Sequence, residues 1–229
     1  MTSIERTAYP RFPQYRPLRE KELIKLYTPT PDQILLINQF CREQQYRLNF
    51  TLFYKTFQNF GYFPDFEAIP KKIVEHIRKA LEISSNITPI YKSTRTKRKH
   101  QQLIRELLNV SPFDKEARRS AIKIALDAAK TMNTPADIIN VVIEKMIANR
   151  YELPSFDTLD RLVRHCKARI NNIIFNKISN ELSKNLKQDF EELIQPTGEY
   201  NRTGFNQLKK IPKRTTTTHF NELLSHHIN

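Results

Sequence analysis

The sequence predicts an all-α fold: two similar tri-helical, helix-turn-helix-like units joined by a basic segment, with an extended N-terminal arm. Three observations favour this prediction. Only three glycines occur in 229 residues, which disfavours sheet hairpins and phosphate-binding loops, because both depend on glycine. Thirteen prolines punctuate the chain in a way that suits helices begun and ended by proline. Apolar residues recur every three or four positions along several segments, and this spacing is typical of amphipathic helices.

The first predicted segment, residues 1–30, combines an extended arm with a short helix. Prolines at positions 10, 13 and 17 interrupt any helix in the arm, where basic and aromatic side chains are mixed. Such an arm is suited to following a phosphate backbone or a minor groove, and equally to packing its aromatic rings on the body of the protein. We expect the short helix over residues 18–27, before the turn TPTP.

The first helical unit, residues 31–112, begins with a capping signal. Thr30 is expected as the N-cap, Pro31 as the first helical residue and Gln33 as the partner in a capping box. Phenylalanines at positions 50, 53, 57 and 60 share one helix face, which we interpret as core, and Gly61 ends that helix. Helices are expected over residues 31–43, 46–60 and 73–81, and a further helix begins within the basic segment 91–108.

The second helical unit, residues 113–185, is predicted from the same kind of pattern. Helices are expected over residues 114–132, from Pro135 after an N-cap at Thr134, and over residues 157–182. Residues 186–229 are predicted to form a linker and C-terminal tail, with a short helix near residues 220–227. Cys41 and Cys166 each lie in an apolar helical stripe, so we interpret both as buried structural thiols rather than redox or ligand residues.

An internal repeat relates the two units. The segments GYFPDFEAIP, residues 61–70, and RYELPSFDTL, residues 150–159, align at a constant offset that pairs Phe63-Pro64 with Leu153-Pro154. After one residue drops out near position 70, His76 corresponds to His165. In each copy an apolar helix, a turn and a second amphipathic helix follow one another. This is the helix-turn-helix plan, in which the last helix enters the major groove of DNA.

Positive charge is large and clustered. The 38 Lys and Arg residues against 24 Asp and Glu residues give a formal net charge of +14, which predicts a polyanionic partner such as DNA, RNA or an anionic membrane face. Residues 71–105 hold ten Lys or Arg and two Glu, and residues 161–177 hold five Lys or Arg and no acid. The surplus therefore gathers on the last helix of each repeated unit and on the basic segment between them.

Enzyme motifs are absent from the sequence. It contains no GxxxxGK[ST] or GxGxxG loop, no nucleophile elbow and no HExxH pair. We therefore expect no catalytic residue, no metal site and no cofactor in this chain. No stretch approaches the ~18 apolar residues of a membrane span, and the N-terminus lacks the apolar segment of a secretory signal. A cytoplasmic protein without a membrane partner is expected.

Several segments resemble the N-terminal region of transposases of the Tn-three family, the large replicative transposons. They run in order from about residue 2 to 227 and include LYTPTPDQI, KTFQNFGYFP, STRTKRKHQQLIREL, RYELPSFDTLDRLVR and LKKIPKRTTTTHFNELLSH. The resemblance implies DNA-binding domains that recognise the terminal inverted repeats of the element. Transposases of this family are longer and have an RNase H-like domain whose acidic triad binds two metal ions. This chain is therefore expected to be an excised N-terminal piece or a truncated reading frame, with a homodimer expected only in the context of a full-length transposase.

The resulting hypothesis is bipartite recognition of double-stranded DNA by the two units. The residues expected nearest the base edges are Lys71, Lys72, Glu75, Arg78, Arg161, Arg164, His165 and Lys167. Those expected to neutralise phosphates are Arg95, Lys97, Arg98 and Lys99, and Lys92 and Arg169 complete the predicted DNA-binding set. Two alternatives stay open at this point. One is an RNA-binding helical protein, because basic segments do not distinguish the two polymers; the other is a helical interaction module that binds acidic proteins.

Overall fold

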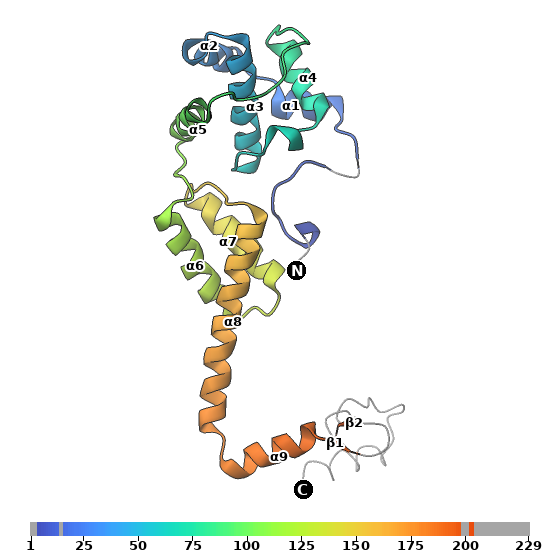
Figure 1. Ribbon diagram of the computed structural model, residues 1–229, viewed down its shortest axis with the longest axis vertical. Coiled ribbons are helices and arrows are strands. Elements are labelled where there is room, and N and C mark those ends of the chain that lie inside the picture. The colour runs from blue at the N-terminus through green and yellow to red at the C-terminus, as the bar shows by residue number, and fades with distance from the viewer. Residues whose placement is uncertain (1–3, 14–15, 198–201, 204–229) are drawn as a thin grey trace. The chain divides into compact units, whose positions relative to one another are not determined.

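The computed structural model describes residues 4–13, 16–197 and 202–203, and helices form most of its regular structure (Figure 1). The predicted all-α class is confirmed. Two compact units are distinguished by their internal contacts: unit 1 is Met1–Asn171 and unit 2 is Asn172–Asn229. Unit 1 contains two helical bundles, preceded by the arm with its short 3₁₀ turn η1 (Ile4–Arg6). The domain boundaries expected from the sequence stay predictions.

The first bundle forms around α3 (Gln44–Phe60). The elements around it are α1 (Glu20–Tyr27), α2 (Pro31–Phe40), the 3₁₀ turn η2 (Phe66–Ala68), α4 (Lys71–Ala80) and α5 (Thr94–Leu108). Because α1, α2, α4 and α5 all contact α3, this helix is buried on most sides. Its phenylalanines lie in the core, as expected. The predicted basic segment thus contributes α5 to the first bundle, in addition to the three helices of the repeat.

Local capping chemistry explains where these helices begin and end. The capping box of α2 is confirmed, since the Gln33 N–H donates to Thr30 Oγ1 (3.3 Å) and the Thr30 N–H donates to Gln33 Oε1 (3.1 Å). The helix ends at Phe40 rather than near residue 43, because the backbone becomes extended at Cys41. Gly61 ends α3 with a φ of 70°, a left-handed conformation that glycine adopts without strain.

The second bundle consists of α6 (Lys115–Ala129), α7 (Pro135–Ala148) and the part of α8 (Phe156–Glu181) that belongs to unit 1. Buried alanines on α6 allow α7 to approach closely, and they include Ala117, Ala121 and Ala125. Asp114 caps α6 by accepting the N–H groups of Glu116 and Ala117. Thr134 occupies the expected N-cap position of α7. Its side chain makes no capping hydrogen bond, however, unlike that of Thr30.

Two turns that correspond in the internal repeat meet between the bundles. The Leu153 N–H donates to the Gly61 carbonyl oxygen at 2.8 Å. Ser111, in the segment that joins the bundles, bonds to the same turn. Its N–H donates to the Arg150 carbonyl oxygen, and the Glu152 N–H donates to the Ser111 carbonyl oxygen, each at 2.8 Å. These backbone hydrogen bonds hold the two copies of the repeated turn against each other within unit 1.

The aromatic rings of the described arm pack on the body of unit 1. Tyr9 is buried, and its hydroxyl donates to the Pro154 carbonyl oxygen at 2.8 Å. Phe12 meets Phe60 edge to face, with ring centroids 4.6 Å apart. Tyr9 belongs to the core of the second bundle and Phe12 packs against the core of the first. The arm therefore contacts both bundles, as the packing alternative expected of its aromatic side chains.

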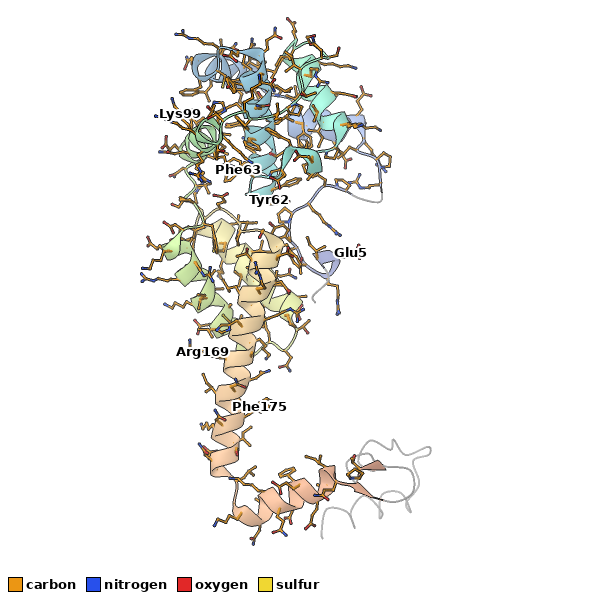
Figure 2. The ribbon with its side chains drawn as sticks, in the orientation of Figure 1. Glu5, Tyr62, Phe63, Lys99, Arg169 and Phe175 are labelled. Carbon is orange, nitrogen blue, oxygen red and sulfur yellow. The ribbon has the colours of Figure 1, made fainter. Side chains whose placement is uncertain are left out.

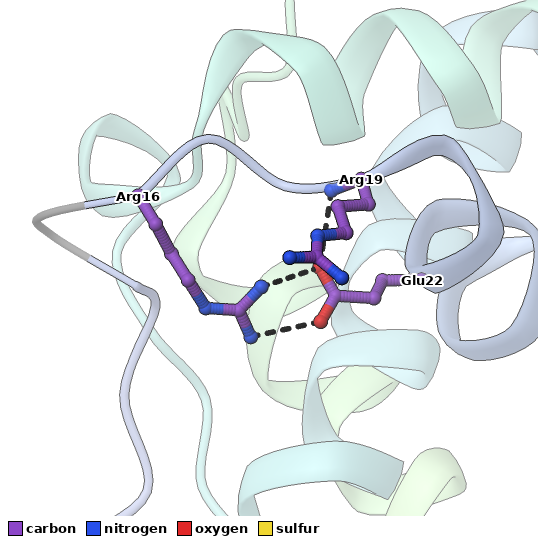
Figure 3. A network of polar contacts seen from close by, with 3 residues as sticks. All are labelled: Arg16, Arg19 and Glu22. Atoms are coloured by element: carbon purple, nitrogen blue, oxygen red, sulfur yellow. Dashed lines mark hydrogen bonds and ion pairs between the residues drawn. The ribbon is translucent and has the colours of Figure 1, made fainter.

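A small polar network of Arg16, Arg19 and Glu22 lies where the arm meets α1 (Figure 3). The Arg16 guanidinium donates to both carboxylate oxygens of Glu22, at 2.8 and 2.9 Å. The Arg19 backbone N–H also donates to Glu22, at 3.0 Å. These hydrogen bonds, that from Arg16 first, lower the pKa of the Glu22 carboxyl to about 2. Glu22 thereby ties the arm to the first turn of α1.

Unit 2 contains the C-terminal part of α8, followed by α9 (Lys184–Ile194). The short strands β1 (Pro196–Thr197) and β2 (Arg202–Thr203) form an antiparallel pair. Phe175 on α8 is exposed (Figure 2). The short helix expected near residues 220–227 lies outside the described residues. Among the described helices of the whole chain, none has the length and apolar character needed to cross a membrane.

Candidate nucleic-acid interface

The outer face of α5 presents exposed cations. His100 and Ile104 are buried on the inner face of the helix, whereas Arg95, Arg98 and Lys99 are exposed. Within the described part of the chain, the side chains of these three cations form no ion pair or hydrogen bond. Figure 2 shows Lys99 projecting away from unit 1. They are therefore available to a phosphate backbone or to another anion.

A second basic surface lies between α6 and α8. The α6–α8 groove has a volume of about 420 Å³ and is lined by Arg118, Ile122, Leu126, Thr158, Arg161, Leu162, His165, Cys166 and Arg169. Its rim carries three guanidinium groups and an imidazole, and apolar side chains form its floor. The Arg161 Nε donates to the Asp157 carbonyl oxygen at 3.2 Å, which holds the side chain along the helix. The predicted residues Arg161, His165 and Arg169 are thus brought together with Arg118.

Arg118 is a residue that the sequence reasoning missed. It lies on α6, outside both basic clusters that were singled out by charge counting. A signal was available in the alanine pattern. Because Ala117, Ala121 and Ala125 mark the buried face of α6, the cations between them must point outward, and Arg118 is one of these.

Other predicted DNA-binding cations have partners inside the protein. The Lys167 ammonium donates to the carbonyl oxygens of Ala129 (3.2 Å) and Met132 (2.8 Å) and to the Asn133 side chain (3.1 Å). A cation is stabilised there because unpaired carbonyls carry negative partial charge at the end of a helix, here α6. Arg164 pairs with the buried carboxylate of Asp160 at 2.9 Å. Lys167 and Arg164, both on α8, thus contribute to the structure of the second bundle.

The first bundle has two further cations of this kind. A guanidinium nitrogen of Arg78 donates to the Ile87 carbonyl oxygen at 2.7 Å, so this half-buried residue anchors the loop after α4. The Lys97 ammonium lies 3.8 Å from an Asp65 oxygen and 5.8 Å from the centre of the Phe53 ring. Lys71 and Lys72 are exposed at the start of α4, and Lys92 is exposed just before α5. These last three cations are positioned to meet a ligand.

The two histidines that correspond in the repeat differ in environment. Nε2 of His76 lies 2.7 Å from Thr28 Oγ1, and burial lowers the pKa of this half-buried imidazole. His165 is exposed at the α6–α8 groove. The two histidines therefore occupy corresponding positions on α4 and α8, but their surroundings differ.

Both cysteines are buried, as predicted. Burial raises the pKa of Cys41 to about 11 and raises that of Cys166 as well, so both remain thiols at neutral pH. Among the described residues, no three His, Cys, Asp or Glu side chains gather closely enough to hold a metal ion.

Comparison with known proteins agrees with the resemblance predicted from the sequence. A family model described as "Domain of unknown function (DUF4158)" matches residues 1–166. The transposase for transposon Tn1546 from Enterococcus faecium is 24% identical over 216 residues, which cover 93% of this chain. The transposase for transposon Tn501 from Pseudomonas aeruginosa is 21% identical over 208 residues, which cover 90% of this chain. The chain spans about a fifth (21%) of the length of each of these two relatives, and the resemblance to a transposase is confirmed.

Proposed function

Because this chain belongs to the family described as domain of unknown function (DUF4158) and is similar to transposases, we propose that unit 1 binds double-stranded DNA at the terminal inverted repeats of a transposon. The observation that carries the proposal is the set of exposed cations on α5 and around the α6–α8 groove. Both surfaces belong to one compact unit, so a single duplex contacts them at a fixed spacing. The bipartite arrangement expected from the internal repeat paired α4 with α8, and the proposal replaces α4 by α5.

The α6–α8 groove is suited to the phosphate backbone. Arginine donates several N–H groups in a planar fork that matches phosphate oxygens, and three arginines converge on this groove. Thr158 adds a hydroxyl beside them. Contacts of this kind set the position of the protein on DNA and provide affinity, whereas base preference comes from contacts to base edges.

The proposed role of the chain is recognition rather than catalysis. Cutting and joining of DNA strands would be performed by other parts of a full-length transposase. In this proposal the chain acts in the cytoplasm, and two copies pair when it is part of the full-length protein. The transposase relatives support the DNA partner over RNA or an acidic protein, and the experiment below separates the three.

Binding of a fluorescent inverted-repeat duplex at increasing salt concentration tests the proposal. If unit 1 contacts about 6–10 phosphates, affinity falls about 10³–10⁵-fold between about 50 and 200 mM salt. The double variant Arg161→Gln, Arg169→Gln removes two cations from the α6–α8 groove. It is expected to reduce the slope of log affinity against log salt by about 2.

The matched control is Lys21→Gln, Lys25→Gln, which removes the same charge from exposed positions on α1 and is expected to leave the slope nearly unchanged. Structured RNA that competes as well as the duplex would favour the RNA-binding alternative. Absence of any salt-dependent duplex binding would contradict the proposal and favour the protein-interaction module.

A further inference from the structure

The exposed stripe of α5 carries more than cations. On a helix of 3.6 residues per turn, the side chains opposite the buried Ile104 and His100 share one outward face. The outer stripe of α5 is defined by the exposed residues Arg95, Arg98, Lys99, Gln102 and Glu106. Its N-terminal half is cationic, and its C-terminal half is polar with a single acid.

These side chains are of the types that read base edges in a major groove. Arg and Lys donate to guanine, Gln forms a paired hydrogen bond with adenine, and Glu accepts from cytosine. The expectation from the sequence was that this basic segment neutralises phosphates and reads little sequence. In the structure, residues 94–108 of this segment form a helix, and one face of the helix carries all three kinds of base-reading side chain.

We propose that α5 enters the major groove and that Arg98 and Gln102 determine the base preference of the protein. This inference rests on the proposed DNA binding and goes beyond it by assigning specificity to α5. On the helices expected to read bases, α4 and α8, three of the predicted cations have partners within the protein. Arg78 on α4, and Arg164 and Lys167 on α8, are bonded within the protein.

Gln102 has the geometry that reading adenine requires. Its Nε2 donates one hydrogen bond to Glu106 Oε1 at 2.9 Å, which holds the amide plane. Within the described residues, the second N–H of Nε2 and the carbonyl oxygen Oε1 make no hydrogen bond. One donor and one acceptor are the pair that matches adenine N7 and N6. Glu106 acts here as a positioning residue for Gln102.

The position of α5 in unit 1 is fixed at several points. Ser93 caps its N-terminus by accepting the Thr96 N–H at 3.4 Å, and Tyr91 Oη lies 2.7 Å from His100 Nδ1. Near the other end, Arg105 pairs with Glu152 at 2.7 Å. A groove of about 780 Å³ runs along this end, and Arg98, Gln102 and Glu106 are among the residues that line it. A helix held in this way presents its side chains with the precision that base reading needs.

Selection of bound sequences from random duplexes tests this inference, using the full chain and the variant Gln102→Ala. The substitution changes no charge, so the salt dependence of binding is expected to stay constant. Preference for an adenine at one position of the selected site is expected to fall about 5- to 100-fold, the worth of one paired contact. Arg98→Gln is expected to relax preference for guanine at a nearby position.

The matched control is Gln39→Ala, the same substitution on α2. Gln39 is exposed and, at 100° per residue, lies about 200° around α2 from the buried Ile37, which packs in the same core cluster as α5. Its site preference should equal that of the unaltered chain. If Gln102→Ala and Arg98→Gln both keep the original preference, the inference is overturned while DNA binding stands. If the unaltered chain shows no salt-dependent duplex binding, the proposed function fails and the inference fails with it.

Discussion

His100 is a buried titratable side chain in the first bundle. Its ring lies 2.7 Å from Tyr91 Oη through Nδ1 and 3.8 Å from Cys41 Sγ through Nε2, and it meets the Phe50 ring edge to face. Burial, followed by repulsion from Lys99, lowers the pKa of His100 to about 4. The imidazole is therefore neutral in the folded protein at neutral pH, and it serves packing and hydrogen bonding.

This lowered pKa predicts that acid destabilises the fold. Below about pH 6.5 the unfolded chain takes up a proton at His100, whereas the folded chain does so only near pH 4. The contribution is fully present above pH 6.5 and is lost as the pH falls towards 4, by on the order of 3 kcal/mol. Urea unfolding at pH 7 and pH 4.5 measures it. In His100→Phe, the free energy of unfolding should differ much less between the two pH values than in the unaltered chain. The exposed control His165→Phe should keep the difference of the unaltered chain. Equal pH dependence in His100→Phe and the unaltered chain would contradict the assignment.

At the scale of the helix, two threonines occupy the same position with different chemistry. Thr30 and Thr134 each precede a proline that is the first residue of a helix. Only Thr30 Oγ1 accepts a hydrogen bond from the backbone N–H of the third helical residue, Gln33, and the Thr30 backbone N–H donates to Gln33 Oε1 in return. The two sequences differ at the third helical residue, which is Gln33 in α2 and Asp137 in α7, and only the pattern with Gln matches a capping box.

The difference predicts unequal costs for one substitution. Thr30→Ala is expected to lower the free energy of unfolding by about 1 kcal/mol, since it leaves a backbone N–H of α2 without its cap. Thr134→Ala removes no capping hydrogen bond and is expected to cost clearly less. Chemical denaturation of the two variants side by side provides the measurement. A larger loss in Thr134→Ala than in Thr30→Ala would show that the caps are assigned wrongly.

At the scale of unit 1, the ion pair between Arg105 and Glu152 joins α5 to the turn before α8. The two side chains are 21% and 14% exposed, and the guanidinium also lies 5.1 Å from the centre of the Phe63 ring. Burial raises the pKa of Glu152, and the hydrogen bond from Arg105 opposes that rise. The pair therefore holds a carboxylate that the interior would otherwise disfavour, between residues 47 positions apart in the chain.

Removing the cation is expected to destabilise the whole of unit 1. Arg105→Ala leaves the Glu152 carboxylate buried without its partner, at a cost of about 3 kcal/mol. Lys130→Ala is the matched control, because its ion pair with Asp127 is about 60% exposed on both sides and should contribute less than about 1 kcal/mol. Thermal unfolding of both variants measures the difference. Equal stability of the two would mean that the buried pair does not couple the bundles.

The sequence by itself determined the helical class, the elements of unit 1 to within a few residues, and the kinship with transposases. Scarce glycine, the spacing of apolar residues and capping signals such as Thr30-Pro31 act over one or two helical turns, so they can be seen without knowing the fold. Charge counting also located the basic regions. Which of their members contact DNA stays a prediction.

Only the tertiary structure decided which cations are free. The Lys167 ammonium donates hydrogen bonds to the carbonyl oxygens of Ala129 and Met132, and Arg105 forms an ion pair with the Glu152 carboxylate. Arg118 joins the candidate interface because it lines the α6–α8 groove together with Arg161 and Arg169. Counting charges does not identify Gln102, because its side chain is neutral. It is proposed to contact a base because it lies on the outer stripe of α5. The physical reason is that a side chain's partners come from distant parts of the chain, and no local pattern records them.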